Sequence, residues 1–239
     1  VMIGSLAIFP DLGNATILFL VALLMYSISG IAHRWFATIL GVLTSLSFVS
    51  LTTIKLVGVD KFSKIPVFGY VAKRFSAFFN PFDDVAGAGH QLANSYYAMV
   101  NGGWFGLGLG NSIEKRGYLP EAHTDFVFSI VIEEFGFVGA SLILALLFFL
   151  ILRIILVGVR AKDPFNSMVA IGIGGMILIQ VFVNIGGISG LIPSTGVTFP
   201  FLSQGGNSLL VLSVAIAFVL NIDASEKRAK LYREYEAQL

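Results

Sequence analysis

The sequence predicts an all-α, polytopic membrane protein, and three observations carry this prediction. Hydrophobic residues make up 56% of the 239 residues, and mean hydropathy is +0.87. Charged residues make up only 12%, which is about half the fraction found in a soluble domain. Several uncharged apolar stretches also reach the length of about 20 residues that a membrane-spanning helix needs.

Five apolar stretches account for the expected transmembrane helices. They cover residues 12–32, 35–58, 126–157, 166–190 and 208–222. Residues 1–9 have the pattern of the end of a further helix, which breaks at Pro10. The chain begins at Val1 without a signal-peptide pattern, so we expect the downstream part of a longer protein that forms a single multi-spanning domain. About five transmembrane helices plus a partial first one are predicted.

Basic residues near the helix ends set the expected orientation. Arg34 lies in a tight turn, Arg160 closes the third long stretch, and the tail 223–239 is rich in Lys and Arg. Placing these in the cytoplasm satisfies strict alternation of the helices, and the connections 59–125 and 191–207 become outer loops. Long loops are exempt from this rule, so the cations of the first loop need another role: Lys61, Lys64, Lys73, Arg74, Lys115 and Arg116.

The long extracytoplasmic loop and its shorter neighbour contain segments with membrane-related patterns. Residues 61–79 repeat apolar residues at helical spacing beside cations, which is typical of an interfacial helix and equally of an amphipathic helix packed on the loop. Residues 190–208 carry prolines and glycines yet are apolar, which favours a re-entrant-like segment. Gly205 and Gly206 then open the last helix, where N–H groups suit a phosphate; a tight turn is the alternative.

Composition also excludes several classes of function. A net charge of +1 gives no reason to expect a nucleic-acid partner. The absence of Cys excludes disulfides, thiolate chemistry and Cys-ligated metals. The glycines of residues 106–110 suggest a nucleotide-binding loop, but no strand precedes them, and we reject that interpretation.

Acidic residues surround the start of the apolar stretch 126–157. If its helix begins near Thr124, then Asp125, Ser129 and Glu133 lie on one face. We expect that face to line a cavity open to the outside, with Asp125 at its rim. A helix cap formed by Thr124 and Asp125 is the alternative. The helix dipole would lower the pKa of Asp125, whereas burial beside Glu133 would raise it.

Other polar residues have simpler expected roles. His123 is expected to be a hydrogen-bond partner, because no second His or Cys stands at metal-ligand spacing. Glu134 points off the Asp125 face and should satisfy a partner on a neighbouring helix. Gln180 and Asn184 share a stripe with several glycines, which we interpret as helix packing.

Two long motifs occupy residues 89–136 and 192–208: "GHQLANSYYAMVNGGWFGLGLGNSIEKRGYLPEAHTDFVFSIVIEEFG" and "IPSTGVTFPFLSQGGNS". Together they resemble the SEDS family (shape, elongation, division and sporulation), and "GGWFGLGLGNSIEK" resembles its cell-division branch. The resemblance implies a multi-spanning membrane glycosyltransferase that polymerises lipid II into peptidoglycan strands. The first half of the family's sequence is missing here, so we expect this chain alone to be inactive.

The resemblance also implies roles for individual residues. Asp125 matches the Asp of "HTDF" that the family assigns as essential, and we expect it to act as general base on the acceptor sugar's hydroxyl. Gly117 stands where some relatives carry an acidic residue, so that residue's role is not carried over. The expected substrate-binding residues all lie in the outer loops or at the start of the last helix: Lys115, Arg116, His123, Glu121, Ser203, Gly205, Gly206, Lys73 and Arg74.

No organic cofactor is expected. A divalent cation, Mg²⁺ or Mn²⁺, would suit the pyrophosphate, but the sequence shows no ligand set and leaves the metal site unknown. The resemblance implies a class B penicillin-binding protein (a transpeptidase), other divisome membrane proteins and membrane lipids as partners, in the bacterial cytoplasmic membrane at the division septum. Two other functions stay open: a lipid II flippase, which should show polar residues along its whole path, and a non-catalytic scaffold that recruits a transpeptidase.

Overall fold

The computed structural model describes residues 12–30, 74–87 and 89–238, together with a few isolated helical positions between 34 and 52. These described residues form helices, turns and irregular segments without any strand, which confirms the predicted all-α fold. Three predicted segments lie largely or wholly outside the described residues: 1–9, 35–58 and 61–79, the last including Lys73. Residues 74–79 at the end of the third segment are helical.

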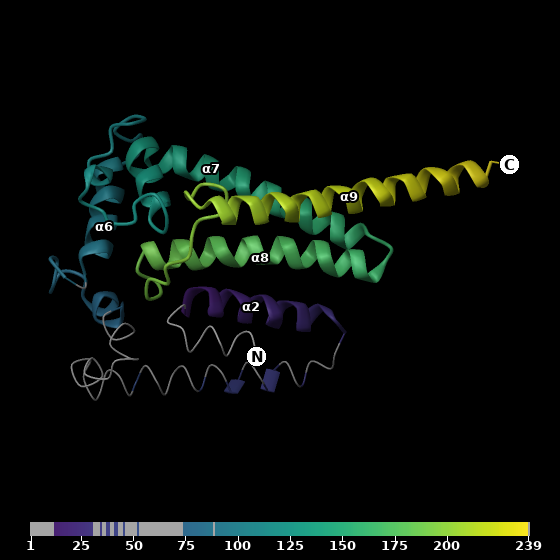
Figure 1. Cartoon of the computed structure of the whole chain (residues 1–239), viewed down its shortest axis with the longest axis horizontal. Coiled ribbons are helices and arrows are strands. Elements are labelled where there is room, and N and C mark those ends of the chain that lie inside the picture. Colours follow the sequence, from purple (N-terminus) through teal and green to yellow (C-terminus); the bar gives the residue numbers. More distant parts are fainter. Residues whose placement is uncertain are drawn as a thin grey trace.

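In the part of the chain that is described, four long helices run side by side and a fifth lies across one end of them (Figure 1). The bundle consists of α2 (Leu12–Ile28), α7 (Val127–Arg160), α8 (Pro164–Ile188) and α9 (Gly206–Glu236). α8 contacts each of the other three, so it is the centre of this bundle. The crossing helix, α6 (His90–Gly102), packs mainly on α7.

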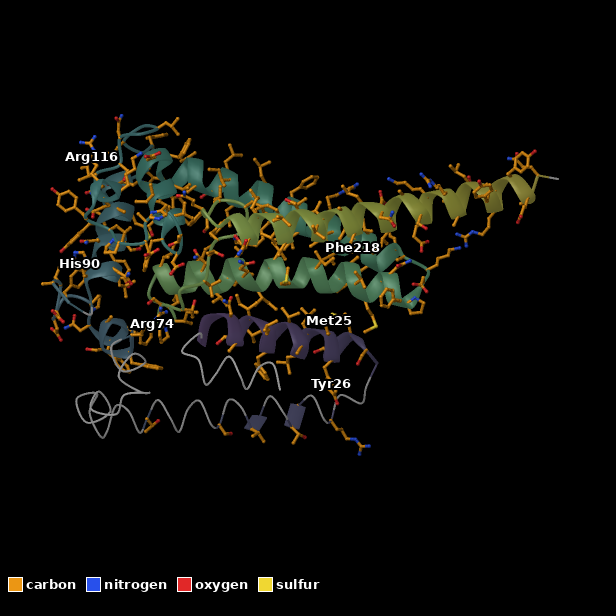
Figure 2. All side chains as sticks on the ribbon, in the orientation of Figure 1. Met25, Tyr26, Arg74, His90, Arg116 and Phe218 are labelled. Atoms are coloured by element: carbon orange, nitrogen blue, oxygen red, sulfur yellow. The ribbon has the colours of Figure 1, made fainter. Side chains whose placement is uncertain are left out.

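α7, α8 and α9 are each long and apolar enough to cross a membrane, and α2 is a shorter apolar helix. Their outer faces carry large exposed apolar side chains, among them Leu142, Leu146 and Phe149 of α7. Phe218 of α9 is another, and Figure 2 labels it midway along the bundle. Exposed apolar area on this scale is unfavourable in water. The chain is a polytopic membrane protein, as predicted.

The bundle has two different ends. At the basic end, Arg160 and Lys162 lie where α7 turns into α8, and Asp163 begins α8 by accepting a hydrogen bond from Asn166 N at 2.9 Å. Pro164 then occupies the first turn of α8, where its missing N–H is not needed. At the loop end lie α6 and the irregular segments that precede α7 and follow α8 (Figure 1).

α9 continues past the predicted end at residue 222 and includes residues 223–236 of the expected tail. Charged pairs at i,i+4 spacing stabilise this exposed part: Lys227 with Asp223 at 2.6 Å, and Lys230 with Glu234 at 3.6 Å. The main-chain N–H of Lys162 donates to Glu226 Oε1 at 3.1 Å and joins α9 to the turn between α7 and α8. Hydropathy marks where the apolar stretch ends, but the helix itself continues into charged sequence.

α7 is broken near its start by Gly136, whose φ of 70° and ψ of 178° are not helical. The loop after α6 enters this break, and main-chain hydrogen bonds cross it in both directions. They join Leu107 N to Glu133 O (2.9 Å), Gly108 N to Glu134 O (3.0 Å), Phe137 N to Gly103 O (2.9 Å) and Val138 N to Trp104 O (3.1 Å). The loop thereby satisfies backbone groups that a broken membrane helix would otherwise leave unpaired.

Candidate functional site

A partly open cavity lies at the loop end, where α7 begins, α8 ends and the segment 189–205 folds back. Its enclosed space is small, about 10 Å³, which is room for roughly one water molecule, and the cavity opens into solvent. Its polar lining comes from distant parts of the chain: Arg74, Gln91, Asp125, Asn184, Ser194 and Thr195.

The segment 189–205 is irregular, and protein groups satisfy much of its backbone. Gly186 O accepts hydrogen bonds from the N–H groups of residues 191 and 192 at 2.9 and 3.1 Å. Gln180 Nε2 donates to Thr198 O at 3.0 Å. The buried ring of Phe199 stacks on Phe128 with the ring centroids 4.7 Å apart. Non-helical backbone next to membrane helices requires such internal partners.

Asp125 is half-buried in the cavity wall. Arg74 lines the same cavity, and its Nη1 donates to Ser194 O. Gly196, with a φ of 74°, lies beside both side chains: a Cβ there would stand 3.3 Å from Asp125 Oδ2 and 3.1 Å from Arg74 Nη2. A side chain at this position would occupy the space next to the carboxylate and the guanidinium, and glycine leaves that space open.

The pKa of Asp125 is raised above its ordinary value. Burial is the main cause, the negative charge of Glu121 adds to it, and the positive charge of Arg74 acts in the opposite direction. The sequence left open whether the pKa of Asp125 is lowered by a helix dipole or raised by burial, and the structure favours burial. The acidic neighbour that adds to this effect is Glu121 and not Glu133. A carboxylate whose pKa lies closer to neutral is a better general base.

Three consecutive main-chain carbonyls hold the backbone that carries Asp125. His123 O accepts from Gln204 N (2.8 Å), Thr124 O from Ser203 Oγ (2.6 Å) and Asp125 O from Asn184 Nδ2 (2.7 Å). We refer to these hydrogen bonds as the carbonyl clamp. Its donors belong to α8 and to the segment 189–205, so the clamp joins the start of α7 to both other walls of the cavity.

The predicted polar face of Asp125, Ser129 and Glu133 does not form. α7 begins at Val127, no side chain caps it, and Asp125 precedes the helix. Ser129 is 0% exposed, with its Oγ 2.7 Å from Ser95 Oγ, and Glu133 is also 0% exposed. Neither residue lines the cavity beside Asp125, which corrects that expectation. The prediction applied helical spacing from Thr124 onward, although the residues before Val127 are not part of the helix. Ser129 and Glu133 therefore do not lie on the same face as Asp125.

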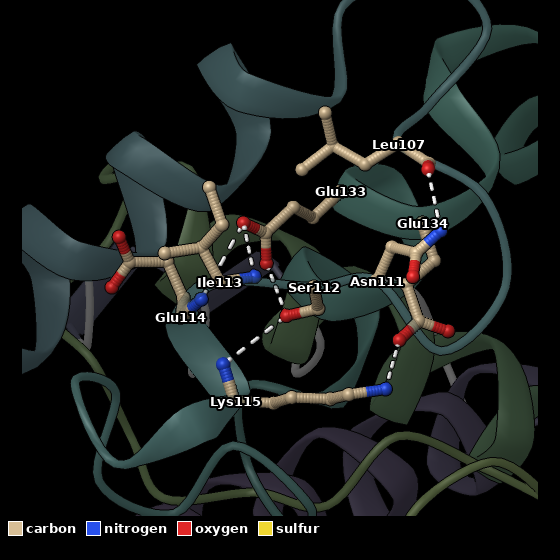
Figure 3. A network of polar contacts seen from close by, with 8 residues as sticks. All are labelled: Leu107, Asn111, Ser112, Ile113, Glu114, Lys115, Glu133 and Glu134. Carbon is tan, nitrogen blue, oxygen red and sulfur yellow. Dashed lines mark hydrogen bonds and ion pairs between the residues drawn. The ribbon is translucent and has the colours of Figure 1, made fainter.

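Glu133 instead holds the loop between α6 and α7. Its carboxylate accepts hydrogen bonds from Ser112 Oγ and from the main-chain N–H groups of Ile113 (3.1 Å) and Glu114 (3.4 Å), as Figure 3 shows. These contacts fix the short 3₁₀ helix η1 (Glu114–Arg116) against α7. Burial, and secondarily the charge of Glu133, raise the pKa of Glu114.

Lys115 and Glu134 form an ion pair beside this network (Figure 3). The expectation that Glu134 satisfies a neighbouring partner agrees with this contact, although the partner lies on the short 3₁₀ helix η1 and not on a membrane helix. Lys115 was expected to contact a pyrophosphate, but its ammonium is directed at Glu134 and it does not line the cavity. Its position is that of a structural cation.

The other predicted charged residues are spread over the loop end. Arg116 is exposed and lies well away from Arg74 in Figure 2. The side chain of His123 is exposed, and only its main-chain carbonyl joins the carbonyl clamp. Glu121, at a φ of 55°, accepts a hydrogen bond from Thr124 Oγ1 at 2.7 Å and acts on Asp125 through its charge. Arg74 is thus the predicted cation that the described structure brings to Asp125.

The residues predicted at the start of the last helix lie close to the cavity but do not line it. Ser203 Oγ donates to Thr124 O and accepts from Phe199 N at 2.7 Å, so both of its hydrogen-bonding roles are occupied within the protein. Gly205 is the N-cap of α9, and Gly206 is its exposed first residue. Ser203 supports the site through the carbonyl clamp.

Asn184 and Gln91 are site residues that the sequence interpretation missed. Asn184 was assigned to helix packing, yet it lines the cavity and binds Asp125 O. Gln91 lies on α6, for which the sequence predicted no position relative to Asp125. The sequence contained one signal for Asn184, because a polar side chain on a membrane helix faces the protein interior or a cavity.

The family model of the FtsW/RodA/SpoVE cell cycle proteins matches residues 1–228. The chain belongs to this family. It is the SEDS family that the motifs around Asp125 and the segment 189–205 resemble, so that prediction is confirmed.

Individual relatives agree with this assignment. The chain is 57% identical over 224 residues to "Probable peptidoglycan glycosyltransferase FtsW" of Lactococcus lactis subsp. lactis (strain IL1403), covering 94% of this chain and 53% of the relative. It is 43% identical over 215 residues to "Stage V sporulation protein E" of Bacillus subtilis (strain 168), covering 89% and 54%. Relatives that carry the FtsW name from several bacteria match at 57%, 51% and 40% identity, in agreement with the cell-division branch. The chain spans about half the length of the curated relatives it matches.

A solved structure has the same fold. It is described as "Structural coordination of polymerization and crosslinking by a peptidoglycan synthase complex", and it superposes with a TM-score of 0.69 at 25% sequence identity. The match covers 94% of this chain and 59% of the other. The described helices therefore form part of a SEDS-family membrane domain.

Proposed function

We propose that the complete protein polymerises lipid II into peptidoglycan strands, with Asp125 as general base. One observation carries this proposal: Asp125 shares a partly open cavity with Arg74, and Gly196 leaves the space beside both of them clear. The names of the relatives, which include a peptidoglycan glycosyltransferase, support the same activity. Among the described residues that line the cavity, Asp125 is the carboxylate and Arg74 is the cation. This pair suits a glycosyl transfer from a pyrophosphate, because that leaving group needs no proton.

The residues have distinct tasks in this reaction. The acceptor sugar's 4-hydroxyl oxygen attacks the anomeric carbon of the donor, and its proton passes to the Asp125 carboxylate. A new glycosidic C–O bond forms while the anomeric C–O bond to the lipid pyrophosphate breaks, and the electron pair leaves with the pyrophosphate. Arg74 is the cation placed to stabilise the charge that develops there.

The proposed reaction takes place at the outer membrane surface. The basic end carries Arg160, Lys162 and the charged half of α9, and the positive-inside rule assigns such an end to the cytoplasm. The cavity lies at the opposite end, which would face outward. This also agrees with a substrate whose sugars are presented on the outer leaflet.

We extend the proposal to partners and location. A solved relative belongs to a peptidoglycan synthase complex that couples polymerisation to crosslinking. A class B penicillin-binding protein is the corresponding partner for this protein, with other divisome membrane proteins at the division septum. The identity to an FtsW relative supports the septal location. Immunofluorescence of the tagged complete protein at mid-cell is the direct test of it.

A divalent cation on the pyrophosphate belongs to the same proposal. Among the described residues, no group of three or more His, Asp or Glu side chains could hold a metal ion. The residues described here therefore do not fit a protein-held metal centre, and we assign no step to one. Polymerisation measured with EDTA, and then with Mg²⁺ or Mn²⁺ restored, tests whether the substrate carries its own cation.

The decisive experiment is polymerisation of purified lipid II in detergent by the complete protein with its partner. Asp125→Asn should lower the rate by about 10²–10⁴-fold, because it removes the proton acceptor and keeps the side-chain shape. Asp83→Asn is the matched control, since Asp83 is an exposed carboxylate of the same loop end. Near-normal strand synthesis by Asp125→Asn would reject the assignment, and absence of polymer from the wild type would favour the flippase or scaffold alternatives.

A further inference from the structure

We infer that Asn184 is a positioning residue for the reaction: its side-chain amide sets the place of Asp125 in the cavity. This inference rests on the proposed function only for its kinetic readout, because the geometry behind it is independent of the substrate. It also gives a role to a residue that the sequence analysis had assigned to packing.

Asn184 is connected to two walls of the cavity at once. Its Nδ2 donates to Asp125 O at 2.7 Å and to Val197 O at 2.6 Å. One acceptor precedes α7, and the other belongs to the segment 189–205. The side chain is only 3% exposed, so water competes little for these hydrogen bonds. The amide therefore fixes the distance between the backbone of Asp125 and the opposite wall.

Asp125 needs such a contact because it lies outside the helix. Residues inside α7 have their backbone dihedrals fixed by the helix, but α7 begins only at Val127. The rest of the carbonyl clamp fixes His123 and Thr124, through Gln204 and Ser203. Asn184 provides the last of these contacts, and it is the one made to the reactive residue itself.

Asn184 Oδ1 supports this interpretation. It is buried and has no hydrogen-bond partner among the described residues. An unsatisfied buried acceptor destabilises a fold, and such groups occur at functional sites. An apolar residue of the same shape would avoid this penalty, but it could not donate to Asp125.

Gln180 offers a matched control for the alternative that Asn184 merely tethers the segment 189–205. It lies four positions earlier on α8, and its Nε2 donates to Thr198 O (3.0 Å) and Thr198 Oγ1 (3.3 Å) of the same segment. Neither bond reaches Asp125. A purely structural tether would make substitutions of Gln180 and Asn184 equivalent, whereas a positioning residue makes only the second affect Asp125.

The experiment compares Asn184→Leu with Gln180→Met in the complete protein with its partner. Both substitutions keep the side-chain shape and remove the donors. Asn184→Leu should lower kcat on the order of 10–100-fold with little change in KM, since a displacement of about 1 Å reduces rates on this scale. The acid limb of the kcat–pH profile of Asn184→Leu should move to lower pH. A displaced Asp125 carboxylate is less buried, and less burial lowers its pKa. Gln180→Met should leave the pH profile unchanged.

A second measurement does not depend on activity. Carbodiimide modification of Asp125, followed by mass spectrometry as a function of pH, reports the protonation of this carboxyl directly. We expect the midpoint to fall for Asn184→Leu and to stay at the wild-type value for Gln180→Met. Arg74 and Glu121, the charged groups that act on Asp125, are unchanged in both variants.

The outcomes separate the two proposals. Equal effects of the two variants, or no shift of the labelling midpoint for Asn184→Leu, overturn the positioning role. A wild-type protein that forms no polymer overturns the proposed function, and the labelling midpoints still decide the role of Asn184. If Asn184→Leu does not accumulate in the membrane, Asn184→Ser, a smaller side chain that keeps one donor, is compared with Gln180→Ser by the same labelling.

Discussion

At the scale of single residues, opposing electrostatic effects determine the pKa of Asp125. Burial and Glu121 favour its protonated form, and Arg74 favours its ionised form. Removal of either nearby charge should therefore shift the pKa of this carboxyl, in a direction that depends on the sign of the charge removed. Glu121 adopts a φ of 55°, which is unusual for a non-glycine residue, and such strain is common near functional sites.

The first prediction uses this balance. A general base works when it is ionised, so the rate falls as the pH drops through the pKa of Asp125. Glu121→Gln removes a negative charge that raises this pKa, and the acid limb of kcat should move to lower pH. Arg74→Gln removes a positive charge that lowers it, so the limb should move to higher pH, and KM for lipid II should increase.

The measurement is the pH profile of lipid II polymerisation by the complete protein. Arg116→Gln is the control, because this exposed cation lies away from Arg74. Its replacement should leave the acid limb of kcat unchanged. Shifts of Glu121→Gln and Arg74→Gln in the same direction would contradict the electrostatic account of Asp125.

At the scale of elements, the break in α7 and the loop that enters it form one unit. Gly136 and Gly106 face each other closely: a Cβ on Gly136 would stand 2.4 Å from Gly106 N, and one on Gly106 would stand 2.2 Å from Glu134 O. Both also have positive φ, at 70° and 77°. Two glycines of the "GLGLG" stretch, Gly106 and Gly108, thus make backbone contacts with α7, in agreement with the rejection of a nucleotide-binding loop.

The second prediction tests this unit. Gly136→Ala should lower the free energy of unfolding by roughly 3 kcal/mol, because it combines a disallowed backbone region with a steric clash. Thermal unfolding of the detergent-solubilised complete protein measures the change as a lower Tm. Gly206→Ala is the control, since a Cβ there meets no atom within 4 Å. Equal stability of the two variants would show that the loop does not depend on the break.

The sequence predicted the elements better than the site, for a physical reason. Apolar length identified α7 and α8 to within a few residues, because burial in lipid requires uninterrupted hydrophobic sequence. Asp125 was found through a motif, but its neighbours were not. Ser129 and Glu133 were misplaced by a helix start that lies at Val127, and Asn184 joins Asp125 through contacts between residues 59 positions apart. Spacing along one helix carries no information about such contacts.

At the scale of the whole molecule, charge and chemistry lie at opposite ends of the bundle. The turn between α7 and α8 and the charged half of α9 form one end, and α6 with the start of α7 and the end of α8 forms the other (Figure 1). Asp125 and the cavity lie at the second end. This arrangement makes membrane orientation a requirement for the proposed function.

The third prediction follows from that orientation. The chain has no Cys, so single cysteines can be introduced for labelling. In the complete protein with any other cysteines replaced, a membrane-impermeant maleimide should label Arg116→Cys in intact cells. Lys230→Cys should react only after permeabilisation. The reverse pattern would place the cavity in the cytoplasm and reject synthesis at the outer surface.

The carbonyl clamp also bears on the order in which the protein is made. Thr124 binds Ser203 across 79 positions of the chain, so Asp125 leaves the ribosome long before its last support is synthesised. Because Ser203 and Gln204 lie between α8 and α9, the carbonyl clamp can be completed only after the segment that follows α8 has been synthesised. A nascent chain stalled before that segment would carry Asp125 without two of the three hydrogen bonds of the carbonyl clamp.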